Sequence, residues 1–178
     1  MNKKSALHLL NQLSVRLEQF SERTGMLVSW LVLAMVLLVS YDVAMRYFFQ
    51  SGSVALQEME WHLFSLIFLI GAAFTLKHDG HVRLDLFSKS KFMDDQRRAW
   101  IDLFGSIFLL IPFCILIILS AWPFVYQSYI HLEGSPDPGG LPYRWILKAS
   151  IPLGFTFLLL QGVSEIVKNL STVLGKDT

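Results

Sequence analysis

The sequence predicts an all-α membrane protein with four transmembrane helices, and three observations support this fold class. Of the 178 residues, 53% are hydrophobic and only 16% are charged, whereas about a quarter of the residues are charged in a typical soluble domain. Four separate stretches are apolar and approach the roughly 20 residues that a membrane-spanning helix needs. These stretches are apolar on all sides, and too few residues remain to cover them in a soluble fold.

The first predicted span comprises residues 25–49. It begins with a charge-free stretch from Gly25 to Tyr41, and the helix continues past Asp42 and Arg46. Two lysines near the start of the chain resemble the beginning of a signal peptide, but no small-residue cleavage site follows the apolar stretch. We therefore expect this span to stay in the membrane.

Residues 1–24 are predicted to form an N-terminal amphipathic arm. Apolar side chains recur there every three or four residues, which is the spacing of one face of a helix. These apolar positions are Leu7, Leu10, Leu13, Leu17 and Phe20. Polar residues such as Arg16 and Glu18 lie between them, so we expect an interfacial helix that rests on the inner membrane surface or on a partner.

The remaining spans are predicted at about residues 58–77, 95–131 and 145–168. Glu58 and Glu60 open the second span, where their charge suits a helix N-terminus. The third follows an aspartate N-cap and contains Pro112 and Pro123, which can kink it. A turn rich in proline and glycine, residues 134–142, leads into the fourth. The whole chain, residues 1–178, is thus predicted to be a single four-helix transmembrane domain.

The distribution of lysine and arginine predicts the orientation of these spans. Only three of the 15 basic residues belong to the loops after spans one and three, namely Arg46, Arg144 and Lys148. The remaining twelve flank the termini and the middle loop. Because basic residues concentrate on the cytoplasmic side, we expect both termini and the middle loop in the cytoplasm and the other two loops outside.

Ionisable residues near the span ends are the first candidates for a functional site. Asp42 and Arg46 are four residues apart and share a helix face, so they can pair near the outer end of the first span. We favour a self-satisfied ion pair there, and a site for a substrate or for a partner helix is the alternative. Glu58 and His62 repeat this spacing at the start of the second span.

No predicted span carries a charge near its centre. A transporter that moves ions by itself usually has carboxylates, broken helices or repeated halves at mid-depth. This chain has no internal repeat, and its mid-membrane polarity is limited to residues such as Ser65, Thr156 and Gln161. The sequence therefore predicts a helper or scaffold subunit rather than a complete transporter.

Several function classes find no support. The net charge of +1 does not favour nucleic acid, and the single cysteine, Cys114, cannot form an internal disulfide. No nucleophile elbow, P-loop, dinucleotide fingerprint or paired-histidine metal motif is present, so we predict no catalytic residue, no metal and no cofactor. One alternative stays open. His62 and His131 both fall near the outer face, which makes a haem-bearing membrane anchor of a respiratory complex conceivable.

Several segments resemble one known family, in order and spacing as well as in composition. They are Tyr41-Asp42-Val43-Ala44-Met45-Arg46-Tyr47-Phe48-Phe49, Gln57-Glu58-Met59-Glu60-Trp61-His62-Leu63-Phe64, Gly71-Ala72-Ala73, His81-Val82-Arg83-Leu84-Asp85, Pro138-Gly139-Gly140-Leu141-Pro142, Ile151-Pro152-Leu153-Gly154-Phe155 and Gln161-Gly162. Together they resemble the small permease subunits of TRAP transporters, the tripartite ATP-independent periplasmic systems, over about residues 25–170. The small membrane subunit of another tripartite carboxylate importer is the nearest alternative, since it also has four spans.

The resemblance implies a role in an inner-membrane symport system, commonly one for dicarboxylates and other organic acids. In that family a large multi-span permease carries the substrate and sodium sites, and a periplasmic binding protein delivers the substrate. The small subunit has no catalytic residues and widens the scaffold, among membrane lipids, against which the large subunit moves. The implied interface or docking residues are Asp42, Arg46, Glu58, Glu60 and Trp61. The implied structural residues of the inner loop are His81, Arg83 and Asp85.

Overall fold

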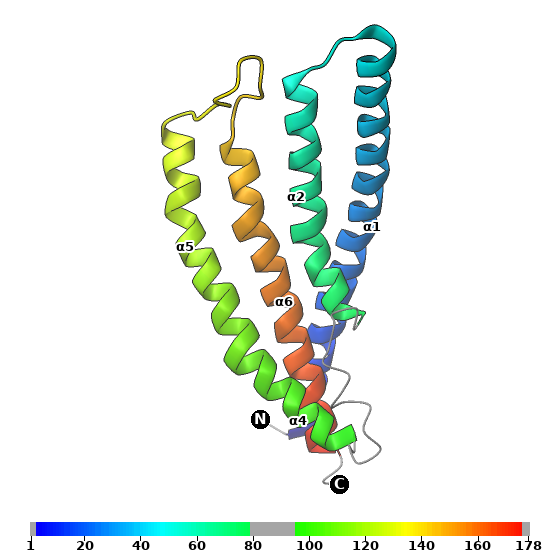
Figure 1. Cartoon of the computed structure of the whole chain (residues 1–178). Coiled ribbons are helices and arrows are strands. Elements are labelled where there is room, and N and C mark those ends of the chain that lie inside the picture. Colours follow the sequence, from blue (N-terminus) through cyan, green and yellow to red (C-terminus); the bar gives the residue numbers. More distant parts are fainter. Residues whose placement is uncertain (1–2, 79–94, 176–178) are drawn as a thin grey trace.

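The computed structural model describes residues 3–78 and 95–175, and these residues form long helices joined by short connections (Figure 1). The elements are α1 (Lys3–Phe49), α2 (Val54–Lys77), α4 (Asp95–Gly105), the π-helical turn η1 (Ser106–Leu110), α5 (Ile111–Ile130) and α6 (Trp145–Gly175). Four helical stretches are long and apolar enough to cross a membrane: Ser14–Phe49, Val54–Lys77, Ala99–Ile130 and Trp145–Ser171. The predicted all-α, four-span fold class is therefore confirmed.

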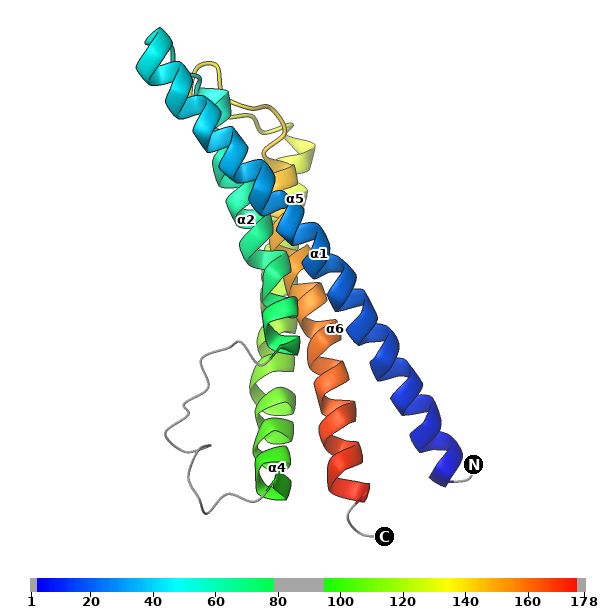
Figure 2. The same ribbon diagram turned by 90° about the vertical axis from the view of Figure 1, so that its right-hand side faces the viewer.

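Helix α6 is the central helix of the bundle. It packs against α1, α2, α4 and α5, and α1 also packs against α2. The two described ends of the chain and the start of α4 lie at one end of the molecule (Figure 1). The half of the bundle nearer to them is here called the termini end. The other end carries the α1–α2 connection and the 131–144 connection between α5 and α6, and is called the loop end. Helix α1 crosses the other helices at an angle (Figure 2).

Helix α1 differs from the prediction of a separate arm followed by a span. It continues without a break for 47 residues, a length of about 70 Å at 1.5 Å per residue, against about 30 Å for the hydrocarbon core of a bilayer. Ser14 and Ser21 are buried, and each takes part in a hydrogen bond to α6. These contacts align the segment from Ser14 onward with α6. Contact of residues 1–24 with a membrane surface or a partner stays a prediction.

The third span contains a π-helical turn immediately before Pro112. The N–H of Ile111 bonds to the carbonyl oxygen of Ser106, five residues earlier. A proline has no N–H to donate, and its ring clashes with the carbonyl four residues back, here that of Phe108. Widening the preceding turn relieves this clash while the helix continues. The predicted effect of Pro112 thus takes the form of a local π turn, whereas Pro123 lies inside regular α5.

Close helix packing depends on two glycines. A Cβ atom at Gly154 of α6 would lie 2.8 Å from the backbone oxygen of Leu69 in α2. A Cβ atom at Gly25 of α1 would lie 2.1 Å from the Phe74 ring of α2. Glycine therefore allows α1, α2 and α6 to approach closely, as small residues do in membrane bundles.

Candidate subunit-interface site at the loop end

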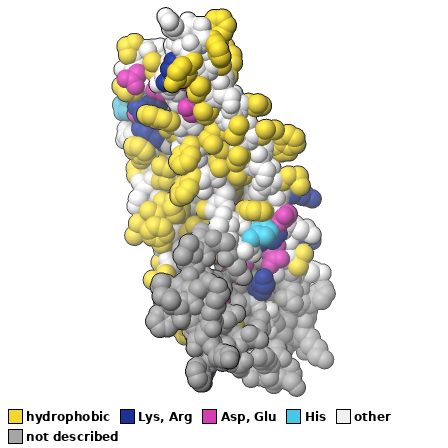
Figure 3. All heavy atoms as spheres, turned by 45° about the vertical axis from the view of Figure 1, so that its right-hand side comes forward, with side chains coloured by type: hydrophobic (Ala, Val, Ile, Leu, Met, Phe, Trp, Pro, Cys, Tyr) yellow, Lys and Arg dark blue, Asp and Glu magenta, His cyan; other side chains and the backbone are white. Residues whose placement is uncertain are grey.

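Charged side chains gather at two levels of the molecule, and hydrophobic side chains cover much of the surface between them (Figure 3). At the termini end, Glu22 forms an ion pair with Lys77. The Oε1 atom of Glu18 lies 4.0 Å from the Nζ atom of Lys168. At the loop end, the ion pairs are Asp42–Arg46 and Glu133–Lys148. Charge at both ends of an apolar belt is the distribution expected of a membrane-spanning bundle.

Glu58, at the start of α2, holds the connection between α5 and α6. Its carboxylate accepts hydrogen bonds from the Ser135 hydroxyl and from the backbone N–H of Leu141, the latter at 2.6 Å. The connection also closes on itself, because the N–H of Ser135 bonds to the Leu141 oxygen at 3.0 Å. A Cβ at Gly140 would lie 2.8 Å from the Glu58 carboxylate and 2.4 Å from the Ser135 hydroxyl oxygen, so only glycine leaves room for this arrangement.

Glu58 and His62 have the same spacing as Asp42 and Arg46, but their side chains do not form a hydrogen bond or an ion pair with each other. The Nδ1 atom of His62 instead lies 2.6 Å from the backbone oxygen of Glu58. The physical reason is that the connection offers the carboxylate two donors at once, whereas His62 offers one. Sequence spacing identifies only local partners, and Ser135 lies 77 positions further along the chain.

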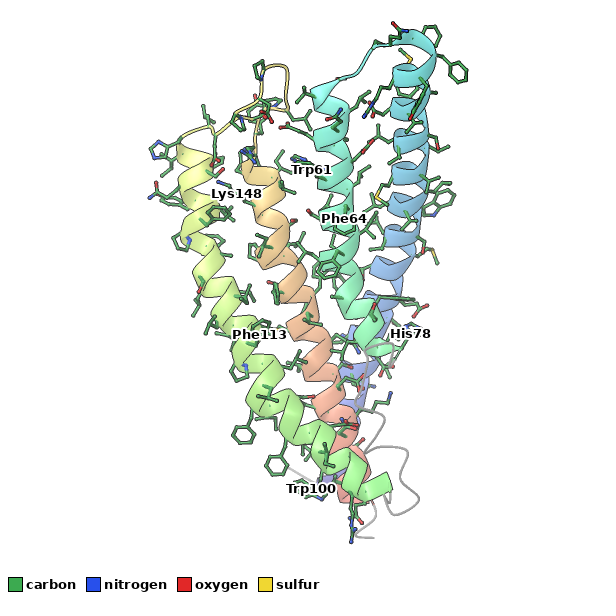
Figure 4. The ribbon with its side chains drawn as sticks, in the orientation of Figure 1. Trp61, Phe64, His78, Trp100, Phe113 and Lys148 are labelled. Carbon is green, nitrogen blue, oxygen red and sulfur yellow. The ribbon has the colours of Figure 1, made fainter. Side chains whose placement is uncertain are left out.

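A second contact holds the same connection from the side of α6. Lys148 lies near the start of α6 (Figure 4) and donates a hydrogen bond to Glu133. Its Nζ atom lies 4.0 Å from the centroid of the Phe124 ring of α5. The hydrogen bond from Lys148 holds the pKa of Glu133 below its usual value. The backbone N–H of Arg144 donates a hydrogen bond to the backbone oxygen of Glu133 at 2.8 Å. This anchor was not predicted from the sequence, although Glu133 and Lys148 flank the proline- and glycine-rich turn.

The predicted ion pair on α1 is formed. Arg46 donates to Asp42, whose side chain is almost fully buried while that of Arg46 is 51% exposed. The other carboxylate oxygen of Asp42 and the Oε1 atom of Glu60 are buried without a hydrogen-bond partner among the described residues. Trp61 is 70% exposed. Of the predicted interface residues, Arg46 and Trp61 are therefore the most accessible to a partner, whereas Glu58 is engaged within the chain.

Polar contacts at the termini end join helices to each other. The Ser21 hydroxyl donates to Gln161 Oε1 at 2.6 Å, and the Gln161 amide donates to Glu165 at 3.2 Å. Gln161 is fully buried. The predicted structural residues His81, Arg83 and Asp85 lie outside the described residues, so their role stays a prediction. Within residues 3–78 and 95–175, no three histidine, cysteine, aspartate or glutamate side chains lie close enough to hold a metal ion.

The fold and these contacts define a multi-pass membrane protein whose spans are tied together near both ends and carry their charges away from mid-depth. No individual curated protein matches the chain. Residues 35–172 match the family described as tripartite ATP-independent periplasmic transporters, DctQ component. The chain therefore belongs to the DctQ family and is a small membrane subunit of a TRAP transporter, located in the inner membrane. The match confirms the resemblance derived from the sequence, and the family is one of transporter components.

Proposed function

We propose that this chain is the static scaffold subunit of a sodium-coupled importer of organic acids. In this proposal the chain binds a large multi-span permease, which carries the substrate and sodium sites. A periplasmic protein delivers the substrate to the pair. The observation that carries the scaffold role is the set of ties near both ends of the bundle, Glu58–Ser135 and Lys148–Glu133 at one end and Ser21–Gln161 at the other.

A scaffold must keep its shape while a neighbouring domain moves, and these ties resist relative movement of α1, α2, α5 and α6. The placement of charge in the described residues also supports a scaffold. The ion pairs described above lie toward the span ends, whereas transport sites use charged groups or broken helices at mid-depth.

The loop end is proposed to face the periplasm, because few basic residues lie there. Arg46 and Trp61 are proposed to contact the large subunit or the binding protein through their exposed side chains. Asp42 positions Arg46, and Glu58 shapes the 131–144 connection rather than touching a partner. Glu60 is proposed to border the same interface.

Co-purification tests the proposal directly. The tagged chain is expressed with the proteins encoded beside it, extracted in mild detergent and analysed by mass spectrometry. A one-to-one complex with a large multi-span protein supports the accessory role. A chain that purifies with redox subunits and a haem absorption band would reject it in favour of a respiratory anchor.

Uptake assays test the proposed interface. Arg46→Glu is expected to lower substrate uptake while the variant still inserts into the membrane, because it reverses an exposed charge at the loop end. Arg16→Glu, an exposed charge reversal on the same helix at the termini end, is the matched control. Unchanged uptake in Arg46→Glu would remove Arg46 from the interface. Asp85→Ala is expected to lower the yield of the complex, and an unaltered yield would refute a structural role for the inner loop.

A further inference from the structure

A cavity of about 280 Å³ lies near the loop end between α2, α5 and α6. Its apolar lining consists of Leu69, Phe124, Leu147 and Ile151, and its polar lining consists of Ser65, Arg144, Lys148 and Ser150. Two of these polar residues are cations. A cavity that combines apolar walls with two cations, placed where the helices approach the end of the apolar belt, is suited to an amphiphilic anion.

Two polar groups of this cavity have unused hydrogen-bonding capacity. Within the described residues, neither the guanidinium of Arg144 nor the hydroxyl of Ser65 forms a hydrogen bond. A guanidinium presents five donors in a fork that matches the oxygens of a phosphate or carboxylate. By contrast, the Ser150 hydroxyl already bonds to the Leu147 oxygen at 2.6 Å.

Lys148 adds charge to the same place without being fully used. Its ammonium has three donors, of which one goes to Glu133, and its Nζ atom lies over the Phe124 ring. This contact fixes the ammonium between α5 and α6. Arg144 also acts electrostatically on Glu133. Arg144 acts in the same way on Glu58, so the two cations lie near two carboxylates. Because the guanidinium of Arg144 hydrogen-bonds to neither carboxylate, its donors are available to an added anion.

We propose that this cavity binds the phosphate group of a phospholipid. Arg144 and Ser65 donate hydrogen bonds to the phosphate oxygens, and Lys148 contributes its charge. The apolar side chains of Leu69 and Ile151 contact the glycerol backbone and the first part of an acyl chain. On the cytoplasmic side of membranes, basic pockets between transmembrane helices bind lipid head groups, and the same pairing of cation with phosphate applies to this cavity. The bound lipid would join α2 to α6 on the side where Glu58 and Lys148 fix the connection.

Native mass spectrometry tests this proposal on the full-length chain, together with any subunit that co-purifies with it, reconstituted in nanodiscs of phosphatidylethanolamine and phosphatidylglycerol. We expect one phospholipid to remain bound after the nanodisc is removed. Arg144→Gln is expected to lower its occupancy at least tenfold, and Ser65→Ala to lower it less while leaving folding intact. Arg16→Gln removes an exposed cation outside the cavity and is expected to retain the lipid.

A diacylglycerol with the same acyl chains, which lacks the phosphate, separates the contributions of head group and chains. The proposal predicts that diacylglycerol does not bind. Equal binding of diacylglycerol, or equal phospholipid occupancy in Arg144→Gln and the wild type, would overturn it. Binding of inorganic phosphate without any retained lipid would also overturn the lipid assignment, and would identify a soluble anion as the ligand. None of these outcomes depends on transport, so they test the cavity separately from the proposed function.

Discussion

The two ends of the bundle are stabilised in different ways. At the loop end, the Glu58 carboxylate of α2 holds a non-helical connection, because it accepts hydrogen bonds from Ser135 and Leu141. At the termini end, side chains join one helix directly to another, as Ser21 joins Gln161. The contacts of the loop end thus shape a connection between helices, whereas those of the termini end fix how α1 lies against α6. Between the two ends, the close approach of α2 and α6 at Gly154 fixes the helix spacing on which both depend.

The largest effect is expected from Gly154→Ala, which acts on both ends at once. The added Cβ would meet backbone atoms of Leu69, which cannot rotate away, so we expect a loss of about 1–3 kcal/mol of stability. Thermal unfolding in detergent measures this loss of stability. Gly105→Ala is the matched control, because no atom lies within 4 Å of the added Cβ, and alanine favours a helix over glycine by roughly 0.5–1 kcal/mol. Equal unfolding temperatures for the two variants would contradict the close-packing argument.

Glu58→Ala is expected to act on the loop end alone. It leaves the Ser135 hydroxyl and the Leu141 N–H without their acceptor, so the connection is expected to open more often. Amide hydrogen exchange should increase in residues 135–141 and stay unchanged in α6 near Gln161. Glu58→Gln retains one acceptor oxygen, so its exchange at residues 135–141 should lie between that of the wild type and that of Glu58→Ala. If exchange at residues 135–141 is unaltered in Glu58→Ala, the carboxylate does not hold the connection.

At the termini end, a double-mutant cycle of Ser21→Ala and Gln161→Ala measures the coupling energy between these two side chains. Interhelical hydrogen bonds in membrane proteins contribute about 0.6 kcal/mol on average, so we expect a coupling energy of about that size. The cycle should leave hydrogen exchange at residues 135–141 unaffected. A coupling energy of zero would mean that this 2.6 Å hydrogen bond does not help to join α1 to α6.

The smallest effect is expected from lowering the pH, which should loosen the 131–144 connection at the loop end. Because the pKa of Glu133 is lowered by Lys148, this contact contributes stability above the ordinary glutamate pKa, about 4.3. The contribution is lost as the pH falls through the lower pKa of the folded state. Hydrogen exchange at residues 131–144 should rise in the wild type between neutral and acidic pH. Glu133→Gln should show raised exchange at neutral pH and a smaller change on acidification, and an identical pH response in both would exclude this contact as the cause.

The sequence was sufficient for the spans, because hydropathy depends on composition along the chain and not on distant contacts. It also predicted the Asp42–Arg46 pair, since residues four apart on a helix are neighbours whatever the surrounding fold. The partner of Glu58 could not be predicted, because it depends on how the 131–144 connection folds back over α2. The Ser21–Gln161 contact joins residues 140 positions apart, and its register is set by helix packing. The continuity of α1 was missed because its charged residues resemble the end of a span.

Rigidity within the assembled transporter is the central claim, and a spin-label distance measures it most directly. Ser51→Cys and Gln127→Cys place labels on two exposed positions of the loop end, one after α1 and one on α5, with Cys114 replaced by serine. Distances are recorded in the complex without sodium and then with sodium and the loaded binding protein. The scaffold account predicts one distance distribution that does not change between the two conditions. A second population, or a shift larger than the width of the distribution, would show that this subunit moves with the transport cycle and would contradict the account.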